Sequence, residues 1–74
     1  MQILIKKSWE YILYKDDQKY LLEVVCGGAA IFELKITLNS KEIDDYLSHG
    51  QSYIDQLAEK IRNSPSQYLN RKTE

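Results

Sequence analysis

Two side chains of the sequence are types that act in nucleophilic catalysis: the single cysteine, Cys26, and the single histidine, His49. A thiol attacks substrates when an imidazole lies within hydrogen-bond reach and a third group orients that imidazole. Cys26 follows an apolar run in the stretch VVCGG, and His49 falls midway along a segment with helical periodicity. No sequence feature orients one toward the other. We therefore expect a small, partly buried turn residue and an exposed histidine, in a protein that is not an enzyme.

Cofactor binding is not expected from these residues either. One cysteine, one histidine and scattered carboxylates show no spacing typical of metal ligands. The glycines after Cys26 lead into a strand instead of a helix N-terminus, so the usual phosphate cradle is missing. The sequence therefore predicts no metal and no other cofactor.

The composition limits the classes of partner. Ten Lys and Arg against eleven Asp and Glu leave the 74 residues with a net charge of −1, which gives no general attraction to nucleic acid or anionic lipid. Most aromatic residues fall on the expected core face instead of forming a stacking platform. The first apolar run is too short for a signal sequence or a membrane span, and a lone cysteine fits a reducing compartment. We expect one soluble, cytoplasmic domain over residues 1–74 that binds neither nucleic acid nor membrane.

The first half of the chain, residues 1–38, has the alternation of half-buried β-strands. Every second residue of AAIFELKITL is apolar, which places Phe32 on the core face. A loop of Cys26-Gly27-Gly28 pairs Leu22 with Phe32 and directs Glu23 to solvent. A loop of Gly27-Gly28-Ala29 keeps the same core but sets two glutamates opposite each other. We prefer the first loop, with Gly28 in the left-handed position.

The stretch KSWEYILYKDDQKYLLEVV predicts a further hairpin, which turns around residues 16–18. It places Trp9, Tyr11 and Leu13 on the core face. The segment QILIK is either a separate short strand or the start of one long strand that bends near Lys7. The first half therefore forms an antiparallel β-meander of three to four strands.

The second half has helical spacing. Asn39 followed by Glu42 is a capping box, and the apolar residues that follow recur at steps of three and four. This favours one long helix over residues 39–63, in which Gly50 permits close approach to the sheet; the alternative is two helices that break at Gly50. We expect residues 64–74 to form a short helical turn that ends in a frayed tail from Arg71 onward. The fold class is α+β, with the meander packed against the C-terminal helix.

Two surfaces are candidate partner-binding sites. Asp45, Asp55 and Glu59 lie on a polar stripe of the expected helix, and an acidic stripe can mask a basic site on a partner. Ile12, Leu21 and Ile31 fall on the outer side of the sheet, where an apolar patch rimmed by charges is typical of a protein contact. The register above places Ile12 close to Leu21, with Ile31 one strand further.

The order VVCGG, a strand ending in LN, a helix with YIDQLAEKIR, and then SP with Tyr and Arg resembles small, poorly characterised bacterial proteins of similar length. In size, acidity and layout the chain is also similar to immunity proteins that neutralise secreted bacterial toxins. The second resemblance implies a protein partner, such as a toxin. No functional residue is carried over from either group.

The sequence therefore favours a small protein-binding module, of the inhibitor or immunity type, that masks a partner. The alternative is a homodimerising structural module, joined through the outer sheet face or through an exposed edge strand.

Overall fold

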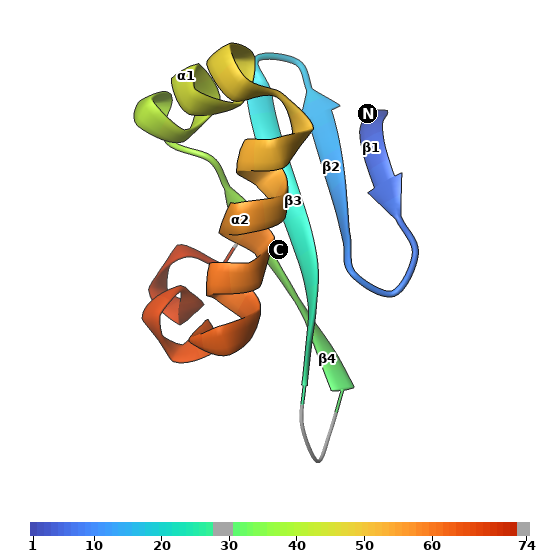
Figure 1. Cartoon of the computed structure of the whole chain (residues 1–74), viewed down its shortest axis with the longest axis vertical. Helices are drawn as coiled ribbons and strands as arrows, with labels where there is room; N and C mark the ends of the chain where they lie inside the picture. Colours follow the sequence, from blue (N-terminus) through green and yellow to red (C-terminus); the bar gives the residue numbers. More distant parts are fainter. Residues whose placement is uncertain (28–30, 73–74) are drawn as a thin grey trace.

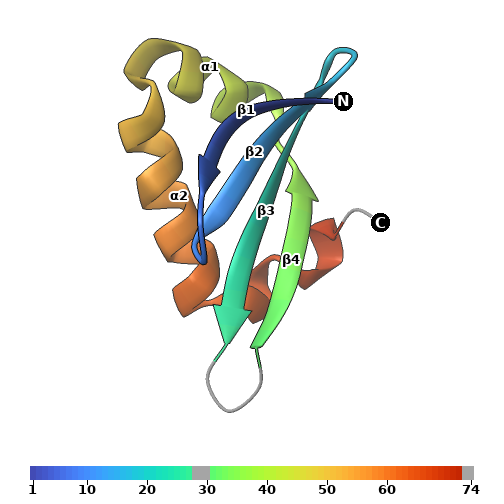
Figure 2. The same ribbon diagram turned by 90° about the vertical axis from the view of Figure 1, so that its right-hand side faces the viewer.

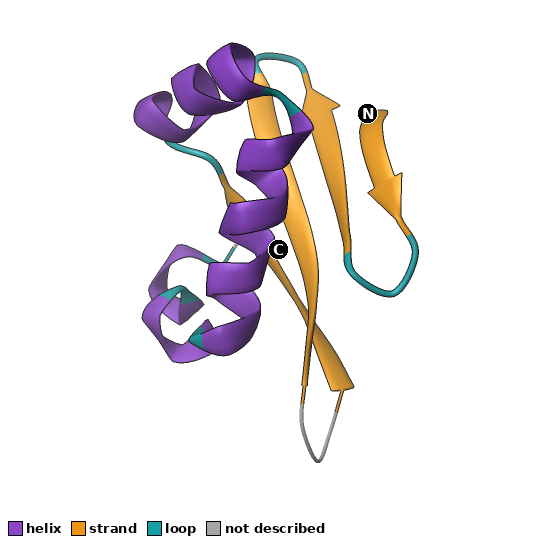
Figure 3. Cartoon of the chain, in the orientation of Figure 1, coloured by secondary structure: helices purple, strands orange, loops and turns teal. Residues whose placement is uncertain are grey.

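The computed structural model describes residues 1–27 and 31–72, which form a four-stranded antiparallel sheet followed by helices (Figures 1 and 3). The strands are β1 (Gln2–Lys7), β2 (Tyr11–Asp16), β3 (Lys19–Gly27) and β4 (Ile31–Thr37), and they neighbour one another in chain order. The helices α1 (Ser40–His49) and α2 (Gln51–Asn63) precede two 3-10 turns, η1 (Pro65–Gln67) and η2 (Leu69–Arg71). The prediction of an α+β meander is confirmed.

The core lies between one face of the sheet and α2 (Figure 2). Alternation along the strands produces it, because successive side chains point to opposite faces. From the strands and the chain that follows them, the buried residues are Tyr11, Leu13, Leu22, Val24, Cys26, Leu34, Ile36 and Leu38; α2 adds Ile54, Leu57, Ala58 and Ile61. We call this side of the sheet the covered face, and the opposite side the outer face.

The β3–β4 register differs from the predicted one. Leu22 pairs with Ile36, not with Phe32, and Cys26 pairs with Phe32 inside the ladder. Because the shift is an even number of residues, every side chain keeps its predicted face. The prediction that Cys26 belongs to the turn was wrong, and the glycine turn itself, with Gly28, lies outside the described residues. Phe32 is 43% exposed because this hairpin extends beyond the helices (Figure 1).

The N-terminal segment is a separate strand, which settles the choice left open by the sequence. β1 pairs antiparallel with β2, with a bulge between Ile3 and Ile5. The bulge lets Leu4 and Ile5 both pack against the core. Trp9, expected in the core, instead lies in the turn between β1 and β2 and is 84% exposed.

The capping box forms as predicted: the Asn39 side chain accepts from the Glu42 backbone N–H at 2.8 Å, and the Glu42 carboxylate accepts from the Asn39 N–H at 2.9 Å. A single continuous helix does not form. Gly50, with φ 70° and ψ −147°, separates α1 from α2, and the two run in different directions (Figure 1). Leu47, one of the apolar residues that recur at helical spacing, is exposed.

The role proposed for Gly50 was also wrong. A Cβ built on Gly50 meets nothing within 4 Å, so no close approach to the sheet requires a glycine there. The backbone angles do require one, because L-residues rarely adopt a φ of 70° with this ψ.

The C-terminal segment is tied to the body where fraying was expected. Arg71 binds the Glu42 carboxylate through both guanidinium ends, at 2.6 and 3.0 Å, and donates to the Thr37 carbonyl at 3.0 Å. Lys72 forms an isolated antiparallel bridge with Ile36 on the edge of β4. The residues after Lys72 lie outside the described range.

Candidate functional site

The residues with catalytic side chains lie on separate elements. Cys26 belongs to the core, near the C-terminal end of β3, and is 1% exposed. His49, in contrast, is exposed at the C-terminal end of α1. Burial raises the pKa of the Cys26 thiol, although the charge of Arg62 opposes this shift. A buried thiol with a raised pKa is a poor nucleophile at neutral pH. Among the described residues, no group of three or more His, Cys, Asp and Glu side chains could hold a metal ion.

The acidic residues of the predicted stripe lie on two helices. Asp45 lies on α1, where it pairs with Lys41 at 3.1 Å, whereas Asp55 and Glu59 lie on α2. The bend at Gly50 therefore interrupts the stripe.

Asp55 is also engaged within the chain. Its carboxylate accepts a hydrogen bond from the Tyr11 hydroxyl at 2.5 Å and lies 3.5 Å from the Lys7 ammonium. Burial of Tyr11, followed by its hydrogen bond to Asp55, raises the pKa of the phenol. Asp55 therefore joins α2 to the sheet and is only partly available to a partner.

The three predicted outer-face residues occupy different environments. Ile12 pairs with Glu23 and is half-buried. Leu21, between Tyr14 and Thr37, is only 6% exposed even though it lies outside the main core. Ile31 pairs with Gly27 near the far end of β4 and is 72% exposed. Ile12 and Leu21 are diagonal neighbours, and Ile31 lies far along the sheet from Leu21.

A polar cluster lies at one end of the outer face, around Tyr14, which pairs with Leu21 across the ladder. The Tyr14 hydroxyl donates to the Glu23 carboxylate at 3.0 Å, and the Lys35 ammonium lies 5.4 Å from the Tyr14 ring centre. Burial, followed by the Glu23 hydrogen bond, raises the pKa of Tyr14. These contacts satisfy the polar groups at this end of the face and leave the other end as its accessible apolar part.

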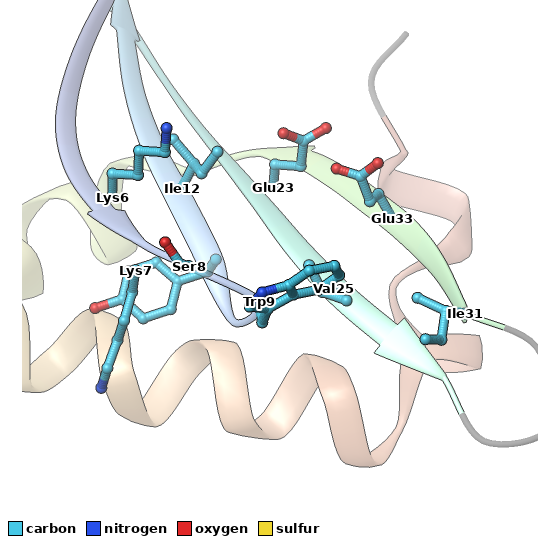
Figure 4. A pocket seen from close by; sticks show the side chains of 10 residues that line it. Lys6, Lys7, Ser8, Trp9, Ile12, Glu23, Val25, Ile31 and Glu33 are labelled. Carbon is cyan, nitrogen blue, oxygen red and sulfur yellow. The ribbon is translucent and has the colours of Figure 1, made fainter.

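A groove of about 350 Å³ occupies that accessible end (Figure 4). Its apolar side chains are Trp9, Ile12, Val25 and Ile31, which we call the Trp9 patch. Lys6 flanks the groove from β1, and Glu23 and Glu33 flank it from β3 and β4 (Figure 4). The mixture of an apolar centre and charges of both signs is typical of a protein contact.

The backbone of Trp9 is unusual for so large a residue. The Glu10 N–H bonds to the Lys7 carbonyl at 3.0 Å, which closes a turn with Trp9 at its third position. Trp9 has a φ of 67°, in the left-handed region where turns of this kind normally carry glycine. A bulky residue there costs about 1–3 kcal/mol of backbone strain. Its indole is nevertheless almost fully exposed, so core packing does not offset that strain.

Comparison of the chain with protein-family models, with curated proteins and with solved structures finds no match. The candidate site therefore rests on geometry alone. Sequence reasoning identified Ile12 and Ile31 as members of the outer face, but it missed Trp9. The position of Trp9 between two alternating segments was the signal that could have indicated a turn.

Proposed function

We propose that this chain is a protein-binding module whose docking surface is the Trp9 patch on the outer face of the sheet. The observation that carries the proposal is the exposed Trp9 at a φ of 67°. Folding alone favours glycine or asparagine at such a position. Tryptophan is among the residues that contribute most to binding energy at protein interfaces. A role in contact with another protein explains both the residue type and its exposure.

The surroundings of Trp9 specify the chemistry of the partner. The partner presents apolar side chains to Trp9, Val25 and Ile31. It carries an acidic group near Lys6 and a basic group near Glu33, because unpaired charges at an interface oppose binding. Such a partner combines an apolar centre with charges of both signs.

The acidic residues of the helices are a weaker candidate for a protein-binding surface than the Trp9 patch. The stripe that would mask a basic toxin is interrupted at Gly50, and Asp55 is already paired with Tyr11 and Lys7. An inhibitor or immunity role stays a prediction, which on this geometry would use the Trp9 patch instead of Asp45, Asp55 and Glu59.

Site-specific photocrosslinking tests the proposal. A benzophenone amino acid replaces Trp9 in one variant and Leu47 in a matched control, because Leu47 is a large apolar residue of α1 that is 66% exposed. In cells that naturally make the protein, we expect a discrete crosslinked protein band from position 9 and none from position 47. Equal labelling from the two positions, or no product from position 9, would contradict the proposal.

A further inference from the structure

We infer that the partner at the Trp9 patch is a second copy of this chain, docked with its outer face against the first. The inference rests on the proposed function and adds the identity of the partner. The two copies are related by a two-fold axis that lies between the faces and runs perpendicular to the strands. The reasons are the charge pattern of the outer face and the poor fit of either sheet edge to a second copy.

The edge at β1 is protected against strand pairing. A bulge between Ile3 and Ile5 breaks the regular ladder, and the strand ends in Lys6 and Lys7. Bulges and lysines are the usual means by which proteins prevent pairing at an edge. A second copy therefore gains little at β1.

The edge at β4 opposes self-pairing for an electrostatic reason. Lys72 already bridges Ile36, which restricts further pairing to the segment from Ile31 to Lys35. An antiparallel pair of identical segments is symmetric about its central residue, which here is Glu33. Two Glu33 carboxylates would then face each other, and like charges directly opposite destabilise strand pairs.

The outer face, in contrast, is self-complementary in charge. The register places Ile12, Glu23 and Lys35 in one row across the sheet, and Val25 with Glu33 in the next accessible row. A two-fold axis between these rows brings Glu33 of each copy opposite Lys35 of the other. Symmetry produces this ion pair twice.

The same axis places the apolar residues together. Trp9 and Val25 line the same groove (Figure 4), and the carbonyl of Glu10, the residue after Trp9, accepts from the Val25 N–H. The rotation therefore brings each indole against the row that holds Ile12 of the other copy. Glu23 enters the interface with a hydrogen bond already in place, because its carboxylate accepts from the Tyr14 hydroxyl. The docked faces then exclude water from Trp9, Ile12 and Val25.

The net charge of the chain and the area of the outer face determine the affinity that we expect for the dimer. A net charge of −1 produces little repulsion between copies. Four strands about 4.8 Å apart with about six residues each give a face of roughly 19 by 20 Å, which is small for an interface. We therefore expect a reversible dimer with a dissociation constant in the micromolar range, roughly 10–100 µM.

Charge reversal provides the test, with the purified full-length chain as its own probe. Sedimentation equilibrium from about 5 to 500 µM is expected to show a monomer–dimer equilibrium. Glu33→Lys and Lys35→Glu should each raise the dissociation constant about tenfold, because symmetry makes each substitution act twice. An equimolar mixture of the two variants should recover wild-type association, since each copy then supplies the charge that the other lacks.

The equimolar mixture of the two variants distinguishes an effect on docking from an effect on folding. If a substitution only destabilised the fold of its own copy, adding the other variant would not restore association. Circular dichroism of each variant verifies that it is folded, and Arg62→Glu, on α2, is the control that should leave the equilibrium unchanged. A wild-type chain that stays monomeric at 500 µM overturns the inference, as does a dimer in which the mixture shows no recovery. If position 9 then crosslinks to a protein of another mass, the proposed function stands and only the identity of the partner was wrong. If position 9 crosslinks to nothing, both fail.

Discussion

The two faces of the sheet are built from the same strands, but they differ in how far the helices cover them. On the covered face, Leu22, Val24 and Ile36 are fully buried, and the side chains of α2 fill the space above them. On the outer face, the Trp9 patch is also apolar, yet Trp9 and Ile31 are exposed and Ile12 and Val25 are only half-buried. The helices therefore cover one face and leave an apolar surface on the other.

This difference separates residues that stabilise the fold from residues that are available for function. Burial of apolar side chains supplies most of the stability of so small a domain, so the covered face has little tolerance for change. An exposed tryptophan in a strained turn contributes little to stability. The following substitutions test whether the two faces divide the roles in this way.

The largest expected effect is in the core. Leu22→Ala removes a fully buried side chain at the centre of the covered face and should lower the free energy of unfolding by about 3 kcal/mol. Ile31→Ala, at an exposed position on the outer face, is the matched control and should change it by less than about 0.5 kcal/mol. Urea denaturation followed by circular dichroism measures both. Comparable losses from the two substitutions would show that the outer face is also part of the core.

The clamp between the C-terminus and α1 should have the next largest effect. Arg71→Ala removes the two-point contact with Glu42 and the bond to the Thr37 carbonyl, and it should cost about 2 kcal/mol. Arg62→Ala is the control, because its contact with Glu10 is 3.8 Å long and both side chains are more than a third exposed. That substitution should stay within about 0.5 kcal/mol. Equal costs would mean that the clamp is only another surface ion pair.

The same clamp predicts a loss of stability in acid. Burial alone would raise the pKa of Glu42, but hydrogen bonds from Arg71 and from the Asn39 N–H lower it below its ordinary value. A lowered pKa in the folded state gives stability that is present above the unfolded pKa of about 4.3 and is lost as the pH falls through the folded value. In urea denaturation at pH 7, 5, 4 and 3, Glu42→Gln should be less stable at pH 7 by about 1–2 kcal/mol and should lose less stability on acidification. An acid dependence as steep as that of the wild type would contradict this assignment.

The sequence predicted which face of the sheet each strand residue joins better than it predicted which of those residues the helices bury. Alternation correctly placed Leu22 and Leu34 on the covered face, and the capping box at Asn39 was also correct. Phe32 has the right face, yet it is 43% exposed, because it belongs to the hairpin of β3 and β4, which extends beyond the helices (Figure 1). Side-chain alternation determines which face a residue joins, whereas its burial depends on where the helices lie.

The candidate site was predicted only in part for a related reason. Ile12 and Ile31 follow from alternation, but Leu21 is buried by its cross-strand neighbours. Trp9 was missed because hydrophobicity favours burial for tryptophan, whereas its place in a turn exposes it. Arg71 was expected to be part of a frayed tail, and no sequence pattern indicates its contact with Glu42, which lies 29 residues earlier. Contacts of this kind depend on the tertiary structure.

Gly50 separates α1 from α2, and a substitution there should have a smaller effect. Gly50→Ala forces an L-residue to a φ of 70° and should cost about 1–2 kcal/mol, with no contribution from a clash because the space around it is open. The angles of Gly50 are nearly the mirror image of polyproline II. D-alanine, introduced by chemical synthesis, therefore fits without strain and should at least preserve stability. Thermal unfolding of the two variants measures the difference, and an equal loss from both would show that backbone angles are not the reason for the glycine.

The smallest expected effect is at Trp9, and it has the opposite sign. Trp9→Asn places at the same φ a residue that tolerates the left-handed region, so the free energy of unfolding of the monomer should rise by about 0.5 kcal/mol. Trp9→Val keeps the strain with a β-branched side chain and should be less stable than Trp9→Asn. Both should weaken docking at the Trp9 patch in sedimentation equilibrium, since both remove the indole. Urea denaturation at low micromolar concentration measures stability apart from association. A Trp9→Asn chain that is less stable than the wild type would mean that the indole supports the fold, and the division of roles between the two faces would then be wrong.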